Sequence, residues 1–209
     1  MKNYKLALHT SGSQLGLSIS NFAGDSRNQT WDLGRDLSNY LHQYLAEFIQ
    51  PQTWQDLEWI AVAKGPGSFT SCRIGLVTAR TLAQQLNLPL FAISTLAAYG
   101  WSKYQENRVN NQPIALQMKA HRGEFFVAIY QVSPDGKGLI KKMSDQAMKP
   151  EVWQQTLEQF TTDYQLIEVP EKLGNTASSV LELANFDYQK GQDAHWSKAL
   201  PFYGQHPVS

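Results

Sequence analysis

The stretch Gly65-Pro66-Gly67-Ser68-Phe69-Thr70 separates an apolar run, residues 59–63, from a helical pattern that extends from about Ser71 to Leu86. This order predicts a strand, a turn and a helix. Two glycines permit backbone angles that other residues avoid, Pro66 restricts the turn, and Ser68 or Thr70 can cap the helix that follows. Such a turn exposes backbone amides at a helix N-terminus, so it either attracts an anion or forms a rigid corner.

Strand patterns precede this turn. The runs at 6–8 and 15–19 enclose a polar turn and predict a β-hairpin, and a third strand is expected at about 28–33. A helix should begin at Asp36 or Ser38 and end before Pro51. After the 71–86 helix, a strand at 89–93 and a helix to about Tyr104 follow, with Ser94 or Thr95 as its cap. The order βββαβαβα predicts a mixed sheet covered by helices.

The second half of the chain repeats this pattern. A polar stretch, 105–112, is the expected boundary between an N-terminal subdomain, 1–104, and a C-terminal subdomain, 105–209. The later elements are strands at 114–118 and 125–130, a weak strand at 139–140, a helix at 150–160, a strand at 166–169 and a helix at 178–188. The predicted fold class is therefore α/β, with a duplicated unit.

Composition restricts the classes of function. Lysine plus arginine and aspartate plus glutamate both number 18, so no net charge would hold the chain on nucleic acid or an anionic membrane. No apolar run reaches the roughly 18 residues of a membrane span, and the start of the chain does not resemble a signal peptide. A single cysteine excludes an internal disulfide. We expect a cytoplasmic protein without a membrane partner.

The histidines do not form a metal-binding pattern. No two of the five are closer than eleven residues in sequence, so a helical pair such as H-E-x-x-H is absent. We therefore predict no metal site.

Two polar turns are candidates for binding a phosphate. Thr10, Ser11 and Gly12 offer hydroxyls and amides, but a hairpin turn uses the same residue types. Gly65, Gly67 and Ser68 form the second candidate, yet neither the Walker lysine nor the third glycine of the dinucleotide fingerprint follows. We favour the structural interpretation for both turns, and we predict no cofactor bound by this chain alone.

The first predicted helix carries a wide apolar and aromatic stripe. Its members are Leu37, Tyr40, Leu41, Tyr44, Leu45 and Phe48. Such a stripe is ordinarily core, but the aromatic residues widen it beyond what one sheet face needs, and tyrosine is enriched at protein interfaces. We therefore predict that this stripe contacts a partner.

The second predicted helix carries two distinct faces. Gly75 and Ala79, four residues apart, permit close approach of another backbone. Arg73 and Val77 lie on another face, which meets solvent or a partner. We assign all four residues to the predicted partner surface.

Several motifs together identify a resemblance. The Gly65–Thr70 stretch is followed by Arg73-Ile74-Gly75, Leu88-Pro89-Leu90 and Ile93-Ser94-Thr95-Leu96, and it is accompanied by Leu8-His9-Thr10-Ser11, Arg122-Gly123-Glu124 and Pro201-Phe202-Tyr203. These segments resemble the bacterial TsaB (YeaZ) family of tRNA threonylcarbamoyladenosine biosynthesis proteins. The resemblance implies a duplicated actin-like ATPase fold, also called the sugar kinase/Hsp70/actin fold. It also implies a non-catalytic subunit that pairs with the paralogue TsaD, which transfers threonylcarbamoyl to adenosine 37 of tRNA.

Two positions depart from the pattern of that family. His9 and Lys119 stand where carboxylates are expected, and neither side chain can replace a carboxylate as a ligand of Mg²⁺. This loss argues against autonomous Mg-ATP hydrolysis, so we predict that the chain is not itself an enzyme. ATP or ADP at the interface with TsaD stays open.

The resemblance also implies partners. They are TsaD, TsaE through the complex, and tRNA only indirectly, with a homodimer when the chain is isolated. Two alternatives are an autonomous actin-like ATPase or kinase and an M22-type metallopeptidase, since the family was once described as M22 glycoproteases.

Overall fold

The computed structural model describes residues 3–106, 112–202 and 204, which form two β-sheets and five α-helices. The first sheet has the order β3-β2-β1-β4-β5. Its strands are β1 (Tyr4–His9), β2 (Gln14–Ser20), β3 (Ser26–Asp32), β4 (Leu57–Ala63) and β5 (Leu90–Ile93). β1 pairs antiparallel with β2, and β2 pairs antiparallel with β3, so the predicted hairpin and the predicted third strand are confirmed. β1 also pairs parallel with β4.

The second sheet repeats the centre of the first. Its order is β8-β7-β6-β9, and its strands are β6 (Ile114–Lys119), β7 (Phe125–Val132), β8 (Leu139–Met148) and β9 (Gln165–Glu168). β6 pairs antiparallel with β7 and parallel with β9, as β1 does with β2 and β4. The predicted duplicated α/β fold is therefore confirmed.

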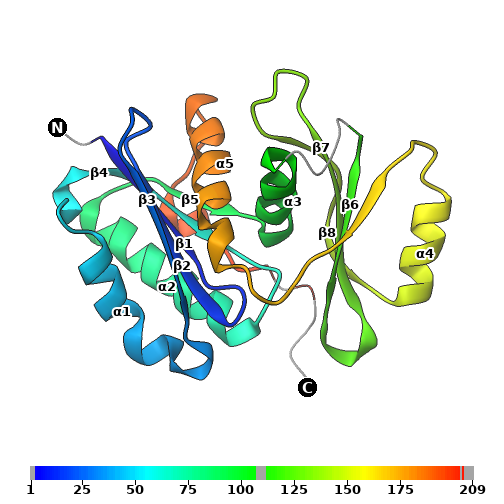
Figure 1. The fold of residues 1–209 in the computed structure, drawn as a ribbon, viewed down its shortest axis with the longest axis horizontal. Helices are drawn as coiled ribbons and strands as arrows, with labels where there is room; N and C mark the ends of the chain where they lie inside the picture. Colours follow the sequence, from blue (N-terminus) through cyan, green and yellow to red (C-terminus); the bar gives the residue numbers. More distant parts are fainter. Residues whose placement is uncertain (1–2, 107–111, 203, 205–209) are drawn as a thin grey trace.

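The helices form layers around and between the sheets (Figure 1). They are α1 (Leu37–Phe48), α2 (Phe69–Leu86), α3 (Thr95–Gln105), α4 (Pro150–Glu158) and α5 (Ala177–Gln189). Short 3-10 turns lie at Gly34–Asp36, Trp54–Asp56, His121–Gly123, Gly174–Thr176 and Trp196–Lys198. α1 and α2 cover the outer face of the first sheet and α4 the outer face of the second, while α3 and α5 lie between the sheets.

The two central helices are exchanged between the halves. α3 belongs to the first half of the sequence but packs against β6 and β7, and α5 belongs to the second half but packs against β1 and β4. Side chains alternate along the strands of the first sheet: Ala7, Ala61 and Ala63 face the inner core between the sheets, while Leu8 and Val62 face the outer core beneath α1 and α2. One hydrophobic core therefore contains residues of both halves.

The 1–104 and 105–209 division stays a prediction. Residues 107–111 of the expected boundary lie outside the described residues, as does Tyr203. Among the described residues, no helix is long and apolar enough to cross a bilayer.

One strand differs from the sequence prediction. The weak strand expected at 139–140 is a ten-residue strand, β8, that extends to Met148. β8 lies at the edge of its sheet and pairs with β7 alone. Its exposed residues include Lys141, Lys142 and Gln146, and such a polar run is typical of a loop in sequence. An edge strand can have the same composition, because it is exposed and often carries charge.

Candidate functional site

The Gly65–Thr70 turn packs directly on the polar turn that follows β1. Gly65 has a φ of +99°, which favours glycine. A Cβ added at Gly67 would lie 2.1 Å from the carbonyl oxygen of Ser11, so only glycine allows the two turns to touch. The Ser68 amide donates to that same Ser11 carbonyl at 2.7 Å. The two turns thus form a single rigid corner.

The polar side chains at this corner bond within the chain. Thr10 Oγ1 donates to the Ser71 carbonyl at 2.8 Å, and Thr95 Oγ1 donates to Ser11 Oγ at 2.8 Å. Ser68 occupies the N-cap position of α2 without a capping hydrogen bond, and its hydroxyl contacts Ser71 at 3.0 Å instead. By contrast, the predicted cap of α3 is confirmed, because Ser94 Oγ accepts from the Ala97 amide at 3.1 Å.

The phosphate candidates only partly share one cavity. The space of about 290 Å³ is lined by Ser11, Gly12, Gly67 and Ser68 together with residues at the end of β6 and just after it, including Lys119 and His121. Thr10 is completely buried beside α2, and Gly65 faces Cys72 and Phe202. Several polar groups that would meet a phosphate are therefore committed to the corner itself.

The two departures from the expected acidic pattern have different surroundings. His9 is completely buried, and burial lowers the pKa of its imidazole to about 3. Its Nδ1 accepts from the Ser11 amide at 3.4 Å, whereas its Nε2 has no partner among the described residues. Lys119 is exposed, with its ammonium 3.9 Å from a Glu168 carboxylate oxygen. A neutral imidazole and an ammonium do not fit a magnesium-bound nucleotide held by this chain alone.

The predicted partner stripe of α1 is divided between core and surface. Leu37, Leu41, Leu45 and Phe48 are buried in the core of this chain, beneath α1 and against the first sheet. The first sheet covers these side chains within the chain itself, although Leu45 also lines the space between α1 and α2, so their contact with a partner stays a prediction. Tyr40 is 44% exposed.

Tyr44 makes a contact within the chain, and its predicted contact with a partner stays a prediction. It is half-buried and stacks on Trp31 of β3, with ring centroids 4.8 Å apart. The aromatic width of the stripe is therefore used partly to cover the edge strand of the first sheet. Sequence periodicity does not report this contact, because Trp31 lies on a separate strand.

The small residues of α2 also have a different role from the expected one. Gly75 and Ala79 are buried, and a Cβ at Gly75 would lie 2.1 Å from Thr10 Oγ1. The close approach is made to the corner of this chain rather than to another protein. Arg73 and Val77 do face outward: Val77 is 60% exposed, and the Arg73 guanidinium lies 3.8 Å from the ring centroid of Phe69.

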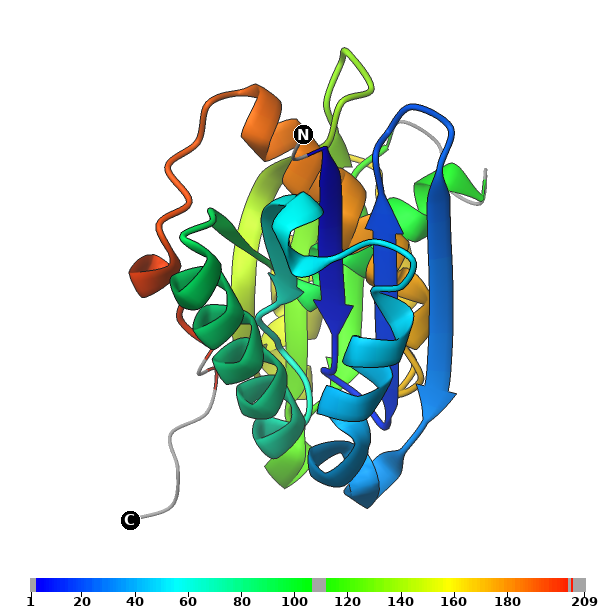
Figure 2. The same ribbon diagram turned by 90° about the vertical axis from the view of Figure 1, so that its left-hand side faces the viewer.

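α1 and α2 lie side by side on the outer face of the first sheet (Figure 2), and residues of both helices line a groove. Its volume is about 540 Å³. Apolar side chains dominate its lining, namely Leu45, Trp54, Ile74, Val77 and Leu82, and His42 and Arg73 also line it. Trp54, Ile74 and Leu82 were not among the predicted contact residues, because Trp54 lies outside both helices and the periodicity of one helix does not indicate which of its side chains face another. Among the described residues, no three His, Cys, Asp or Glu side chains could together hold a metal ion.

Known proteins resemble this chain along most of its length. The family model described as "TsaD: tRNA N6-adenosine threonylcarbamoyltransferase" matches residues 36–188. A Bacillus subtilis (strain 168) protein named "tRNA threonylcarbamoyladenosine biosynthesis protein TsaB" is 44% identical over 80 residues, which are 37% of this chain and 32% of that protein. The Escherichia coli (strain K12) protein of the same name is 29% identical over 109 residues, 52% of this chain and 46% of that protein. These alignments span less than half the length of either relative.

Solved structures extend the likeness to the whole fold. YeaZ from Pseudomonas aeruginosa is 21% identical, with a TM-score of 0.78, over 96% of this chain and 100% of that one. A second Pseudomonas aeruginosa structure, described as similar to peptidase YEAZ, has a TM-score of 0.80 at 21% identity, over 97% and 99% of the two chains. The family model, the TsaB relatives and the shared YeaZ fold together show that this chain belongs to the TsaB (YeaZ) branch of the TsaD family.

Proposed function

We propose that this chain is a subunit in the biosynthesis of threonylcarbamoyladenosine in tRNA, and that it binds and stabilises its catalytic paralogue TsaD through α1 and α2. The observation that carries this proposal is the apolar groove between the two helices, which cover the outer face of the first sheet. Family membership and the names of the TsaB relatives supply the pathway.

The groove has the properties of a helix-docking surface. Val77 is 60% exposed beside the apolar side chains of Ile74 and Leu82. Burying a valine side chain stabilises a complex by about 1.5–3 kcal/mol, and two helices offer grooves into which the ridges of a third can pack. A paralogue built on the same fold carries an equivalent helix pair, so the two pairs can associate around a pseudo-twofold axis as a four-helix interface.

The corner at Gly65–Thr70 supports a non-catalytic role. Thr10, Ser11 and Ser68 use their polar groups within the chain, and a buried neutral His9 takes the place of a carboxylate. The purified chain without TsaD should therefore not hydrolyse Mg-ATP. Saturable turnover by the chain alone would instead support the autonomous ATPase or kinase alternative.

The other partners follow from the same proposal. TsaE is reached through TsaD, and tRNA is contacted only indirectly, because the chain has no net charge with which to hold a polyanion. We assign this role to the cytoplasm. Without TsaD, the open groove should pair with a second copy of this chain, since exposed apolar area favours association.

The test is to mix the purified chain with TsaD of the same organism and follow the complex by sedimentation velocity. The wild-type chain should bind, and Val77→Asp should weaken binding by about tenfold or more, because it puts a charge into the groove. Gln155→Asp, at an exposed position of α4 on the far side of the molecule, is the matched control and should bind like wild type.

The same variant tests the homodimer. Val77→Asp should sediment as a monomer at concentrations where the wild-type chain and Gln155→Asp are dimers. Absence of a wild-type complex with TsaD, or undiminished binding by a folded Val77→Asp chain, would refute the proposed interface.

A further inference from the structure

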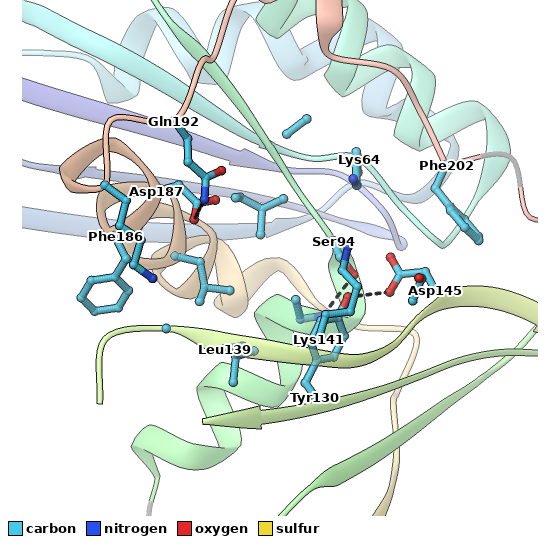
Figure 3. A pocket seen from close by; sticks show the side chains of 17 residues that line it. Lys64, Ser94, Tyr130, Leu139, Lys141, Asp145, Phe186, Asp187, Gln192 and Phe202 are labelled. Carbon is cyan, nitrogen blue, oxygen red and sulfur yellow. Dashed lines mark hydrogen bonds between the residues drawn. The ribbon is translucent and has the colours of Figure 1, made fainter. Parts of the chain in front are cut away.

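A second cavity lies away from both the corner and the groove, where β5, β8 and the C-terminal half of α5 meet (Figure 3). Its volume is about 430 Å³, within the range of small-molecule sites, which is about 300–1,000 Å³. Its walls come from segments far apart in sequence, so no sequence motif indicates the cavity.

One polar group of the cavity centres on Asp145 of β8. The Tyr130 hydroxyl of β7 donates to Asp145 Oδ1 at 2.8 Å, and Ser94 lies beside them at the end of β5 (Figure 3). Burial raises the pKa of Asp145, although the two hydroxyls and the nearby Lys64 and Lys141 oppose this shift. This carboxylate is thus partly desolvated, and a further hydrogen-bond donor would stabilise it.

The other acidic group is Asp187 of α5. Gln192 Nε2 donates to Asp187 Oδ1 at 3.0 Å, and both side chains line the cavity (Figure 3). Burial raises the pKa of Asp187 as well, against the attraction of Lys64 and Lys190. A cationic group of a ligand would replace the stabilisation by water that the Asp187 carboxylate loses on burial.

Cationic side chains lie between and beside the two carboxylates. Lys64 follows β4 directly and is half-buried, and its charge acts on both Asp145 and Asp187. Within the described part of the chain, neither Lys64 nor Lys141 has a carboxylate oxygen within 4.0 Å. Lys190 donates to the Lys137 carbonyl at 3.2 Å. Two ammonium groups thus stay available to a ligand anion.

We propose that this cavity binds a small zwitterion of the amino-acid type. Its carboxylate would lie against Lys64 and Lys141, and its ammonium against Asp187. The apolar part of the wall, formed by Leu139, Leu183 and Phe186, would cover the carbon skeleton. A simple anion bound at Lys64 would compete with Asp187 for that ammonium, and a simple cation would face the lysines, so a ligand that carries both charges matches the cavity better than either. This proposal does not depend on the one made for α1 and α2.

The experiment screens free L-amino acids, in pools grouped by side chain, against the full chain by thermal shift, and then titrates the active pool by calorimetry. We expect one pool to raise the midpoint of unfolding, as any ligand of the folded state must. Asp187→Asn and Lys64→Met should each weaken binding by about tenfold or more, as loss of a close charge pair predicts. Lys142→Met is the matched control, because Lys142 is exposed on β8 but does not line the cavity.

Other outcomes would overturn the proposal. They are the failure of every pool to bind the folded chain, binding that survives both cavity variants, and binding of inorganic phosphate without any amino acid. Circular dichroism establishes that each variant is folded. The cavity variants should still bind TsaD, so this result is read independently of the groove.

Discussion

His9 is an ionisable residue whose charged form is disfavoured by its burial. Its imidazole is completely buried at the end of β1, and its Nε2 lacks a partner among the described residues. An aspartate at this point would carry its charge into the same space. Burial disfavours the charged form of either side chain. A histidine is readily neutral at pH 7, whereas an aspartate would have to take up a proton far above its usual pKa. The replacement therefore fits a corner that packs rather than binds.

The buried imidazole makes stability depend on pH. Because burial lowers its pKa from 6.5 to about 3, the unfolded chain takes up a proton first as the pH falls. Above pH 6.5 this group does not change the free energy of unfolding. Below pH 6.5 it lowers the free energy of unfolding by about 1.4 kcal/mol per pH unit, until the folded state is also protonated. His9→Asn keeps an acceptor for the Ser11 amide but cannot titrate.

The measurement is urea denaturation at several pH values. Between pH 7.5 and pH 5, the wild-type chain should lose about 2 kcal/mol more than His9→Asn does. His42→Asn, at an exposed position of α1, should keep the wild-type dependence. Equal slopes for wild type and His9→Asn would show that the buried imidazole is not the titrating group.

At the scale of elements, α2 illustrates how one helical pattern serves two purposes. Its small residues, Gly75 and Ala79, face the sheet of this chain, while Val77 faces out. Small residues spaced by four predict close approach of another backbone, whether that backbone belongs to the same chain or to a partner. Periodicity identifies the faces of a helix but does not say which face meets the core.

The close contact of α2 with the corner predicts a large effect of one methyl group. In Gly75→Ala the new Cβ would meet Thr10 Oγ1 at 2.1 Å, so α2 or the corner must shift. Overpacking of this kind costs about 1–3 kcal/mol, against a gain in helix propensity of about 1 kcal/mol. We expect net destabilisation, measured by chemical denaturation.

Gly100→Ala is the matched control within α3. There the atom nearest to the new Cβ would be the Leu116 Cδ1 methyl carbon at 3.0 Å, and a shift of that side chain by a few tenths of an ångström would relieve the contact. This variant should be less destabilised than Gly75→Ala. Thr10→Ala should rescue part of the Gly75→Ala loss, and an additive double variant would argue against the contact.

At the scale of the whole molecule, the exchange of α3 and α5 joins the two halves. Each helix covers the sheet of the opposite half, and Trp101 Nε1 of α3 donates to Glu182 of α5 at 2.8 Å. The inner core between the sheets includes residues from both halves, among them Trp59, Phe91, Leu116 and Leu181. Neither half can bury its inner sheet face alone, so the chain should unfold as one unit.

Leu116→Ala tests this coupling. Leu116 is completely buried, and its truncation should cost about 2–5 kcal/mol. The loss should appear in one transition whose midpoint is the same by tryptophan fluorescence and by circular dichroism. Leu166→Ala, at a position 47% exposed on β9, should change stability by only about 0.5 kcal/mol. Two separate transitions would contradict the shared core.

The order of the elements, the duplication and the family could be predicted from the sequence, because they depend on local periodicity, turn chemistry and motifs. The sequence did not determine the roles of Leu41 and Gly75, since a stripe or a small residue looks the same whether its own sheet or another protein covers it. The packing of the Gly65–Thr70 turn on Ser11 is visible only in the folded chain, because the two turns are more than fifty residues apart in sequence. The tertiary structure alone assembled Lys64, Asp145 and Asp187 around one cavity, because those residues come from separate elements that meet only when the two sheets pack together.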